Sequence, residues 1–515
     1  MEKLFEELFD WGRKNKLLLL LSLFYFVFRL INLTKLPIFN DEAIYLDWGF
    51  RETHRAGFLY YSLYDAKQPL LMWIFGIAES ILSDPLFAGR LISVLAGFFT
   101  MLGIYKICKE YFAKEVGLIA VFLYTITPLF SFYDRQALME SAIAAVGIWT
   151  GYFLLKTLLN PASKLSPILL GIVLGIGFFI KSSALLFLGS GFFVLIGYSV
   201  FAKKVRLLNS LVITILTFLV AIFFLLINPQ FWQTLSSNAR YSLTFTEILA
   251  FPLKTWANSL TVNTQIGLTF MTPLLFLLSI VGIIYIFWKG QKNQIILLLF
   301  FILPLLGTTL LVKIPSDRYV VSFLPFLLIP VAYLLWICFK RQKVLGILLI
   351  LIIASIPFLL TLLQIFNPPL YLTKTLPYAP SVNASYLSGV TSGYGINEAV
   401  DYFKSVSQDK PIVVGIAENT GNPESALIDY FANSTNVKVV YFATELFPIK
   451  LNSYDCLSLN SPFYFAARDE QQAGLEKFFQ KIKTISNPYG KNTIGVYTLK
   501  KGCFGKTLIL HINPT

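Results

Sequence analysis

The sequence predicts an all-α polytopic membrane protein of about 11 transmembrane helices, with an interfacial helix in its first external loop and a C-terminal extracytoplasmic α/β domain. Three observations support this fold class. The 515-residue chain is 56% hydrophobic and has a mean hydropathy of +0.68. Only 14% of its residues are charged, against roughly a quarter in soluble domains. Apolar runs of about 17–23 residues recur along the chain, and this length spans a hydrocarbon core of roughly 30 Å.

Short basic segments between the apolar runs predict the orientation. They are Lys3, Arg13, Lys14 and Lys16, followed by KICKEYFAKE, KTLLNPASK, KKVR, KGQK and KRQK. We place all of them on the cytoplasmic side, as the positive-inside rule requires. The predicted spans are then 17–33, 86–107, 116–132, 137–157, 167–182, 184–201, 209–227, 266–288, 294–313, 318–338 and 344–366. The N-terminus lies inside the cell and the C-terminal tail outside it.

The apolar segment 68–82 is too short to cross the membrane, because a helix of this length rises only about 21 Å. We expect an interfacial or re-entrant helix there. The predicted domains are therefore a transmembrane domain over 1–366 and an extracytoplasmic domain over 367–515. In the second domain, 395–406 and 423–434 have helical patterns, whereas 411–417, 437–443, 463–467 and 493–499 have strand patterns. No motif in it indicates its role.

The composition excludes several kinds of site. The net charge of +14 is not a nucleic-acid footprint, because residues 367–515 hold 13 basic and 11 acidic side chains and the excess lies among the membrane loops. Four cysteines and two histidines are too few and too scattered for a metal cluster. Cys456 and Cys503 could form a disulfide if the tail is extracytoplasmic.

Charged side chains gather on the predicted external face. They are Asp41, Glu42, Asp47, Lys67, Asp134, Arg135, Glu140, Lys181, Lys313, Asp317 and Arg318. Each also has a simpler explanation: Asn40, Asp41 and Glu42 suit a helix start, the lysines could snorkel, and each Asp-Arg pair could be a local ion pair. These explanations do not predict that all the groups share one face. Such a set could serve sugar transfer from a polyprenyl phosphate, which needs one carboxylate base and cations for the leaving phosphate.

Five motifs in order resemble the glycosyltransferase C superfamily, in the branch of the protein O-mannosyltransferases and lipid A aminoarabinose transferases. They are NDEAIYLDWG, KQPLLMWIFGIAESIL, AGRLISVLAG, YDRQALMESAIAA and DRYVVSFLPF, within residues 17–340. The resemblance implies an inverting membrane glycosyltransferase that moves a hexose or pentose from a polyprenyl-phosphate sugar. The acceptor would be a hydroxyl of a protein, lipid or surface glycan at the outer face of the cell membrane, and no nucleic acid is involved.

The resemblance also implies roles for individual residues. Asp41 is the expected base, and Glu42 and Glu140 are the further catalytic candidates. The expected contacts to the donor phosphate are Lys67, Arg135, Lys181 and Arg318. No cofactor is expected with certainty, no metal ligand is assigned, and a divalent metal stays open. Gln68 in place of a proline, Ala66 in place of an acid, and Glu140 in place of Asp depart from the family pattern.

The main alternative is a transporter or flippase for a lipid-linked or amphipathic substrate. It should carry ionisable groups near the bilayer midplane and matching halves, neither of which is evident here. A receptor whose tail binds a ligand is a further alternative. The sugar, the acceptor, the lipid length and the oligomeric state stay open.

Overall fold

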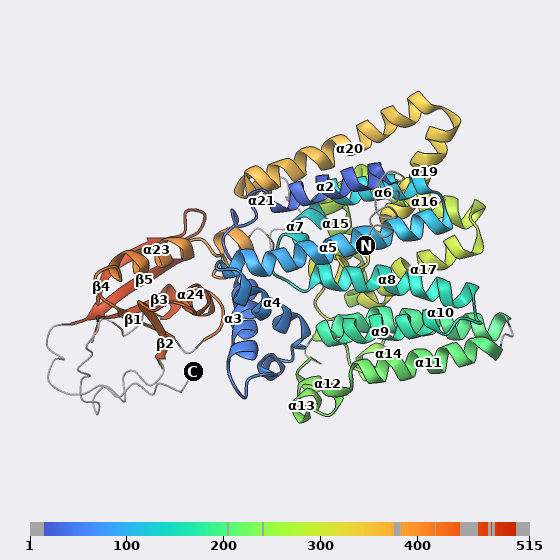
Figure 1. Ribbon diagram of the computed structural model, residues 1–515. Coiled ribbons are helices and arrows are strands. Elements are labelled where there is room, and N and C mark those ends of the chain that lie inside the picture. The colour runs from blue at the N-terminus through green and yellow to red at the C-terminus, as the bar shows by residue number, and fades with distance from the viewer. Residues whose placement is uncertain are drawn as a thin grey trace, which may run out of the picture. The chain divides into compact units, whose positions relative to one another are not determined.

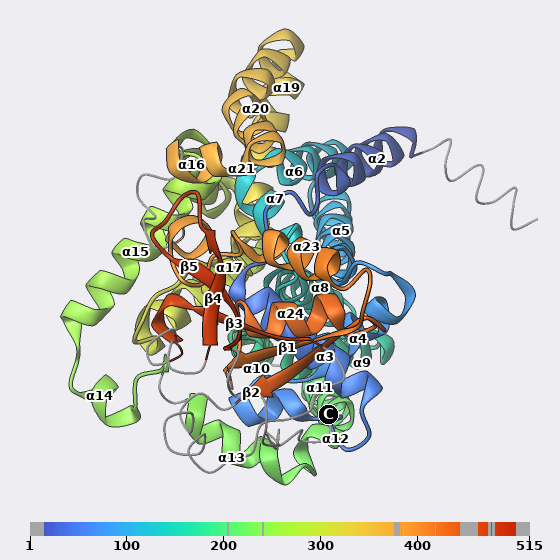
Figure 2. The same cartoon turned by 90° about the vertical axis from the view of Figure 1, so that its left-hand side faces the viewer.

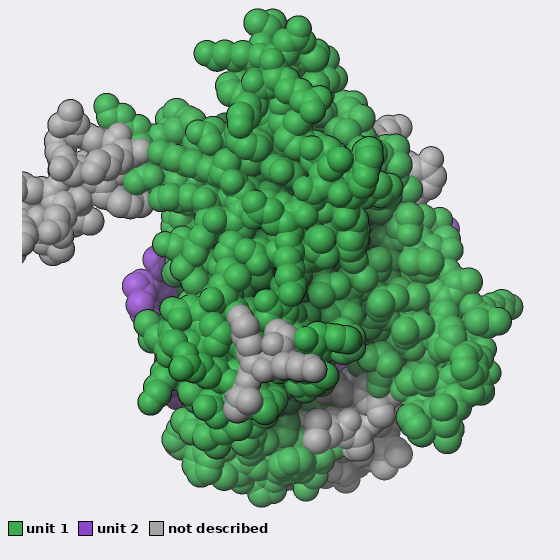
Figure 3. Space-filling model, turned by 90° about the vertical axis from the view of Figure 1, so that its right-hand side faces the viewer, with its two compact units in different colours: residues 1–33, 62–71, 90–378 green, residues 34–61, 72–89, 379–515 purple. Residues whose placement is uncertain are grey.

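The computed structural model describes residues 15–202, 205–238, 241–374, 382, 384–417, 419–442, 462–471, 475 and 479–500. The chain forms two compact units (Figure 3, green and purple). Unit 1 comprises residues 1–33, 62–71 and 90–378, and unit 2 comprises residues 34–61, 72–89 and 379–515. This division by packing assigns parts of the first predicted loop to the unit that contains the tail. The functional boundary at residue 366 stays a prediction.

Unit 1 is a bundle of helices whose long members run side by side (Figure 1). These are α2 (Lys16–Leu30), most of α5 (Pro85–Tyr111), α6 (Lys114–Ile126), α7 (Pro128–Asp134), α8 (Glu140–Leu159), α9 (Leu165–Ile180), α10 (Leu185–Ala202), α11 (Val205–Ala221), α15 (Leu253–Met271), α16 (Pro273–Lys289), α17 (Lys292–Leu311), α19 (Leu328–Arg341) and α20 (Lys343–Phe366). Shorter helical pieces are η1 (Tyr61–Asp65), η2 (Ser182–Ala184), α12 (Phe223–Leu226), α13 (Pro229–Asn238), α14 (Phe245–Leu249), α18 (Asp317–Val320), η4 (Leu324–Leu327) and α21 (Pro368–Lys374). Helix α9 packs against α8 and α11, and α19 packs against α6, α16 and α20.

The predicted polytopic helical fold is confirmed, since every predicted span overlaps a helix. Among the described residues, six helices are long and apolar enough to cross a membrane, or up to eight if each bent pair counts as one span. The count of about 11 spans and the orientation of the termini stay predictions.

The predicted span 266–288 contains a sharp break between two helices. Helices α15 and α16 meet there at 116°. The break lies at Thr272, whose φ of 75° is left-handed, and the following Pro273 has no N–H for a helical hydrogen bond. A milder bend of 67° separates α6 from α7, where Thr127 is extended before Pro128.

Unit 2 packs residues 34–61 and 72–89, which follow the first apolar helix, together with the C-terminal tail. Its helices are α3 (Asn40–His54), most of α4 (Leu70–Ile81), α23 (Ile396–Val406) and α24 (Glu424–Phe431), with the short turns η5 (Ala384–Ser388) and η6 (Asp469–Gln471). At 12 residues, α4 is the short apolar helix that the sequence predicts. Helices α3 and α4 cross closely, because a Cβ on Gly76 would lie 2.1 Å from the carbonyl oxygen of Gly49. Only glycine permits this approach.

The sheet of unit 2 confirms the predicted α/β tail. Its strands are β1 (Ile412–Ala417), β2 (Val437–Phe442), β3 (Phe463–Arg468), β4 (Phe479–Ser486) and β5 (Thr493–Leu499), in the order β2-β1-β3-β5-β4 (Figure 2). Strand β1 pairs in parallel with β2 and β3, whereas β5 pairs antiparallel with β3 and β4. Helix α24 contacts both β2 and α3 (Figure 1). The predicted disulfide partners Cys456 and Cys503 lie outside the described residues.

Candidate functional site

In unit 1, a buried carboxylate binds two cations that are distant in sequence. Glu140 begins α8, and its Oε1 accepts hydrogen bonds from Lys181 Nζ at 2.7 Å and Arg318 Nε at 2.6 Å. The Glu140 side chain is fully buried, whereas Lys181 and Arg318 remain 16% and 21% exposed. Lys181 occupies the break between α9 and η2, and Arg318 lies in the short helix α18. The predicted candidates Glu140, Lys181 and Arg318 therefore form one cluster.

Lys67 lies near this cluster. It is close enough to Lys181 for the two cations to repel each other, and its Nζ lies 6.0 Å from the centre of the Tyr241 ring. The neighbouring Gln68 fixes this segment, because its Oε1 accepts a hydrogen bond of 3.1 Å from the backbone N–H of Ser182. Two cations thus bind one carboxylate and a third lies near them, and the excess positive charge suits a phosphate.

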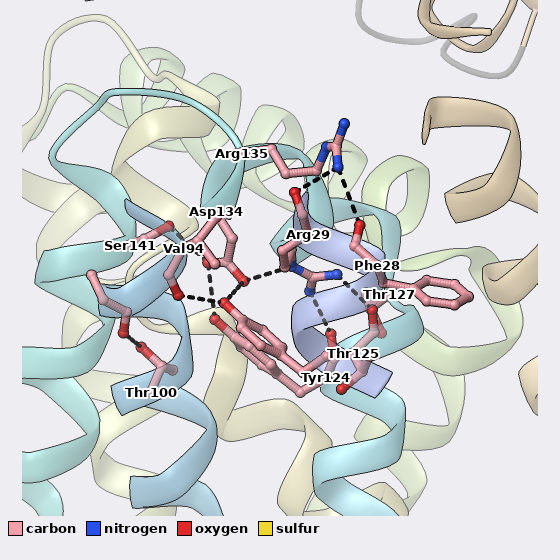
Figure 4. A network of polar contacts seen from close by, with 12 residues as sticks. Phe28, Arg29, Val94, Thr100, Tyr124, Thr125, Thr127, Asp134, Arg135 and Ser141 are labelled. Carbon is pink, nitrogen blue, oxygen red and sulfur yellow. Dashed lines mark hydrogen bonds and ion pairs between the residues drawn. The ribbon is translucent and has the colours of Figure 1, made fainter. Parts of the chain in front are cut away.

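Asp134 belongs to a separate buried network that the sequence did not reveal (Figure 4). Its carboxylate accepts hydrogen bonds from Tyr25 and Arg29 at 3.1 Å each, from Tyr124 at 3.1 Å and from Ser141 at 2.8 Å. Arg29 also donates to the backbone oxygens of residues 124 and 125. The network joins α2, α6, α7 and α8, and it has the character of a structural support.

Arg135 completes the C-terminal end of α2. Its guanidinium donates to the backbone oxygens of Phe28, Arg29, Ile31 and Asn32 at 2.7–3.2 Å (Figure 4, in part). Carbonyl oxygens at a helix end lack helical partners, and a cation there also interacts favourably with the helix dipole. The predicted phosphate contact of Arg135 stays a prediction that these contacts do not support.

In unit 2, Asp41 and Glu42 occupy the first turn of α3. Glu42 is fully buried, and its Oε2 accepts a hydrogen bond of 2.9 Å from the backbone N–H of Phe39. Glu42 therefore serves the helix start, as the simpler explanation from sequence expected. Asn40 was expected at the N-cap, but Phe39 holds that position and the Asn40 side chain accepts from the backbone N–H of Asn422. Asp41 is half-buried on the same turn.

Asp47, further along α3, is buried and ion-paired. Its Oδ1 lies 2.6 Å from Nε of Arg51, and the guanidinium of Arg51 donates to the Tyr441 hydroxyl at 2.9 Å. Burial raises the pKa of Asp47, and the Arg51 charge opposes this shift. This pair links α3 to strand β2 within unit 2.

The described residues offer no group of three or more His, Cys, Asp or Glu side chains placed to hold a metal ion.

Residues 66–232 match the family model described as dolichyl-phosphate-mannose-protein mannosyltransferase. A comparison with curated protein sequences found no match.

The whole chain resembles two solved transferase structures in fold. One is ArnT from Cupriavidus metallidurans bound to undecaprenyl phosphate, with 12% identity, a TM-score of 0.60, and 94% of this chain and 98% of that chain covered. Its apo state matches with a TM-score of 0.57 at 12% identity, over 95% and 98% of the two chains. The other is the Archaeoglobus fulgidus oligosaccharyltransferase in complex with zinc and sulfate, with 14% identity, a TM-score of 0.52, and 96% and 73% covered.

Proposed function

The chain has the fold of the glycosyltransferase C superfamily, and from this premise we propose that it is a membrane glycosyltransferase. It moves a hexose or pentose from a polyprenyl-phosphate donor to an acceptor hydroxyl at the outer face of the cell membrane. The cluster of Lys67, Lys181 and Arg318 around Glu140 carries the proposal. Two features support it: the residues match the expected phosphate contacts, and ArnT of the same fold is solved with undecaprenyl phosphate.

In the proposed reaction, the acceptor oxygen attacks the anomeric carbon while the bond from that carbon to the phosphate oxygen breaks. A single displacement inverts the configuration at this carbon. The departing polyprenyl phosphate is a stable anion, so it needs cations and no general acid. Lys67 and Arg318 stabilise the charge that develops on it, together with Lys181.

Asp41 is the proposed base that accepts the proton of the acceptor hydroxyl. It is half-buried at the first turn of α3, whereas the neighbouring Glu42 is fully buried. Of the two, Asp41 is therefore the better candidate. The contacts of Glu140 favour a positioning role, since its Oε1 holds both Lys181 and Arg318.

Binding of the departing lipid phosphate tests the role of the cations. We expect Lys67→Met to weaken binding of undecaprenyl phosphate to the detergent-solubilised chain by about 10- to 100-fold, the range of one charge-assisted hydrogen bond. This change leaves both ion pairs of Glu140 in place. The matched control is Lys313→Met, because Lys313 pairs with the half-exposed Glu247 at 3.1 Å and such surface pairs contribute little. Equal affinities for wild type and Lys67→Met would contradict the assignment.

A further inference from the structure

Unit 2 contains a cavity that the proposed chemistry does not use. It has a volume of about 450 Å³, within the range of roughly 300–1,000 Å³ typical of small-ligand sites. Its walls come from α3, the end of α4, the start of α5, α23 and the segment from α24 to β2. All of these lining residues belong to unit 2.

Two buried carboxyl groups line this cavity, and three of their four oxygens have no hydrogen-bond partner among the described residues. Glu79 is 6% exposed and Asp429 is 4% exposed. Oε1 of Glu79 and both carboxyl oxygens of Asp429 accept no hydrogen bond from the described residues. An unpaired buried carboxyl group is unfavourable, so these oxygens call for donors from outside the protein.

The nearby charged groups leave the two carboxyls unsatisfied. Asp47 and Arg51 act on Asp429 electrostatically, but Arg51 is already paired with Asp47 and bonded to Tyr441. The remaining polar lining includes Lys404, the amide side chains of Gln408, Asn433 and Asn436, and the hydroxyls of Ser407, Ser434 and Thr435. Aromatic residues, among them Phe50, complete the walls.

We propose that this cavity binds a hydroxyl-rich ligand of the glycan class, with Glu79 and Asp429 accepting hydrogen bonds from its hydroxyl groups. Amide side chains, carboxyl groups and an aromatic surface match a sugar, which presents both donors and acceptors beside apolar C–H faces.

A cation fits the cavity less well. No third acidic, His or Cys side chain among the described residues is placed to complete a metal site with this pair. Lys404 lines the same cavity and repels cations. Burial raises the pKa of both carboxyls, and the neighbouring acids raise it further, so the pair carries less negative charge for a cation than two ionised carboxylates would.

The cavity also suggests how such a ligand relates to transfer. Phe50 lines it, and Asp41 lies nine residues earlier on the same helix, about 14 Å along the axis. A glycan acceptor held here could extend toward the proposed base. This acceptor role rests on the proposed function, whereas glycan binding itself does not.

Binding of the full-length, detergent-solubilised chain to a printed array of microbial glycans tests the proposal without any donor. We expect wild type to bind a defined subset, and Asp429→Asn to weaken that binding by about tenfold, as for the loss of a hydrogen bond that leaves a ligand hydroxyl without its acceptor. Asn433→Trp keeps both carboxyls but fills the cavity, and should also reduce binding. The matched control Asp401→Asn alters an exposed carboxylate on α23 outside the cavity and should bind as wild type does.

Each outcome bears on the proposal. Absence of glycan binding by wild type, or binding that both cavity variants retain, would overturn it. Stabilisation of wild type by Mg²⁺ or Ca²⁺ that Asp429→Asn abolishes, without glycan binding, would also overturn it and identify a cation site. Glycan binding that disappears with Asp429→Asn supports the cavity proposal even if the protein consumes no donor. A failure of the cavity proposal can therefore be told apart from a failure of the proposed glycosyltransferase function.

Discussion

At the scale of single residues, the dipeptides Asp134–Arg135 and Asp317–Arg318 show that a sequence places charged groups without identifying their ion-pair partners. A local ion pair was one open explanation for each. Instead, Asp134 binds Arg29 and Arg318 binds Glu140, whereas Asp317 accepts hydrogen bonds from the hydroxyls of Tyr133 and Ser316. Adjacent residues on a helix point in different directions, so they rarely pair with each other. The distant partners depend on the packing of helices, which a single sequence does not specify.

The buried pair of Arg29 and Asp134 should stabilise unit 1. Both side chains are almost fully buried, at 0% and 2% exposure. We expect Arg29→Met to lower the free energy of unfolding by about 3–5 kcal/mol, because it leaves Asp134 without its cation. Thermal unfolding in detergent measures this effect. Lys16→Met, on the exposed face of the same helix, is the control, and equal stability of the two variants would refute the expectation.

At the scale of elements, the predicted strands and helices of the tail are confirmed, but β4 was missed. Strand β4 exposes five consecutive residues, Gln480 to Thr484, and lies at the edge of the sheet. Its sequence therefore lacks the buried apolar run that marks β1 and β3. Pairing with β5 holds it in place, and only the fold shows that pairing.

The break between α15 and α16 was also missed, because both halves are apolar. Thr272 adopts φ 75° and ψ 144°, a region that costs a residue with a Cβ roughly 1–3 kcal/mol. We expect Thr272→Gly to stabilise the protein by about 1 kcal/mol, measured by thermal unfolding in detergent.

The matched control for this change is Thr264→Gly, within the regular part of α15. It should lower stability slightly, since glycine is the poorer helix former. Stabilisation by both changes, or by neither, would mean that Thr272 is not strained.

At the scale of the whole molecule, the stability of unit 2 should depend on pH. Burial raises the pKa of Glu79 and Asp429 above their ordinary values of 4.5 and 3.8 in the folded chain. Their contribution to stability is thus fully present below those values and is lost as pH rises through the higher folded values. Asp47, Arg51 and Lys404 face the same region and contribute to the profile.

We expect the unfolding temperature of wild type to fall as pH rises above about 4.5, and Asp429→Asn to flatten this fall. Differential scanning calorimetry of the full chain across pH 4–8 measures it. Asp401→Asn, an exposed carboxylate on α23, should leave the profile unchanged. A steeper fall in Asp429→Asn would contradict the assigned direction.

Composition and the periodicity of apolar runs predicted the architecture of the chain, because membrane spans and α/β elements have strong local signals. The close packing of 34–61 with the tail could not be predicted. It depends on local contacts such as the Asn40–Asn422 hydrogen bond and the 4.4 Å stacking of Phe39 on Tyr386. For the candidate site, the sequence predicts only that Glu140, Lys181 and Arg318 share the external face of the membrane. It does not predict the two ion pairs of Glu140.

The role of Asp41 as the base is the central claim, and donor turnover tests it most directly. Membranes of the source organism supply the native acceptor, so we would express wild type and Asp41→Asn there. We would then follow the loss of sugar from a panel of labelled polyprenyl-phosphate sugars.

Asp401→Asn is the matched control, because it makes the same change at an exposed carboxylate of unit 2. We predict that wild type and the control consume one donor, whereas Asp41→Asn folds normally and is at least 100-fold slower, the lower range of general-base catalysis. Equal turnover by Asp41→Asn and wild type, or no turnover of any donor, would contradict the account.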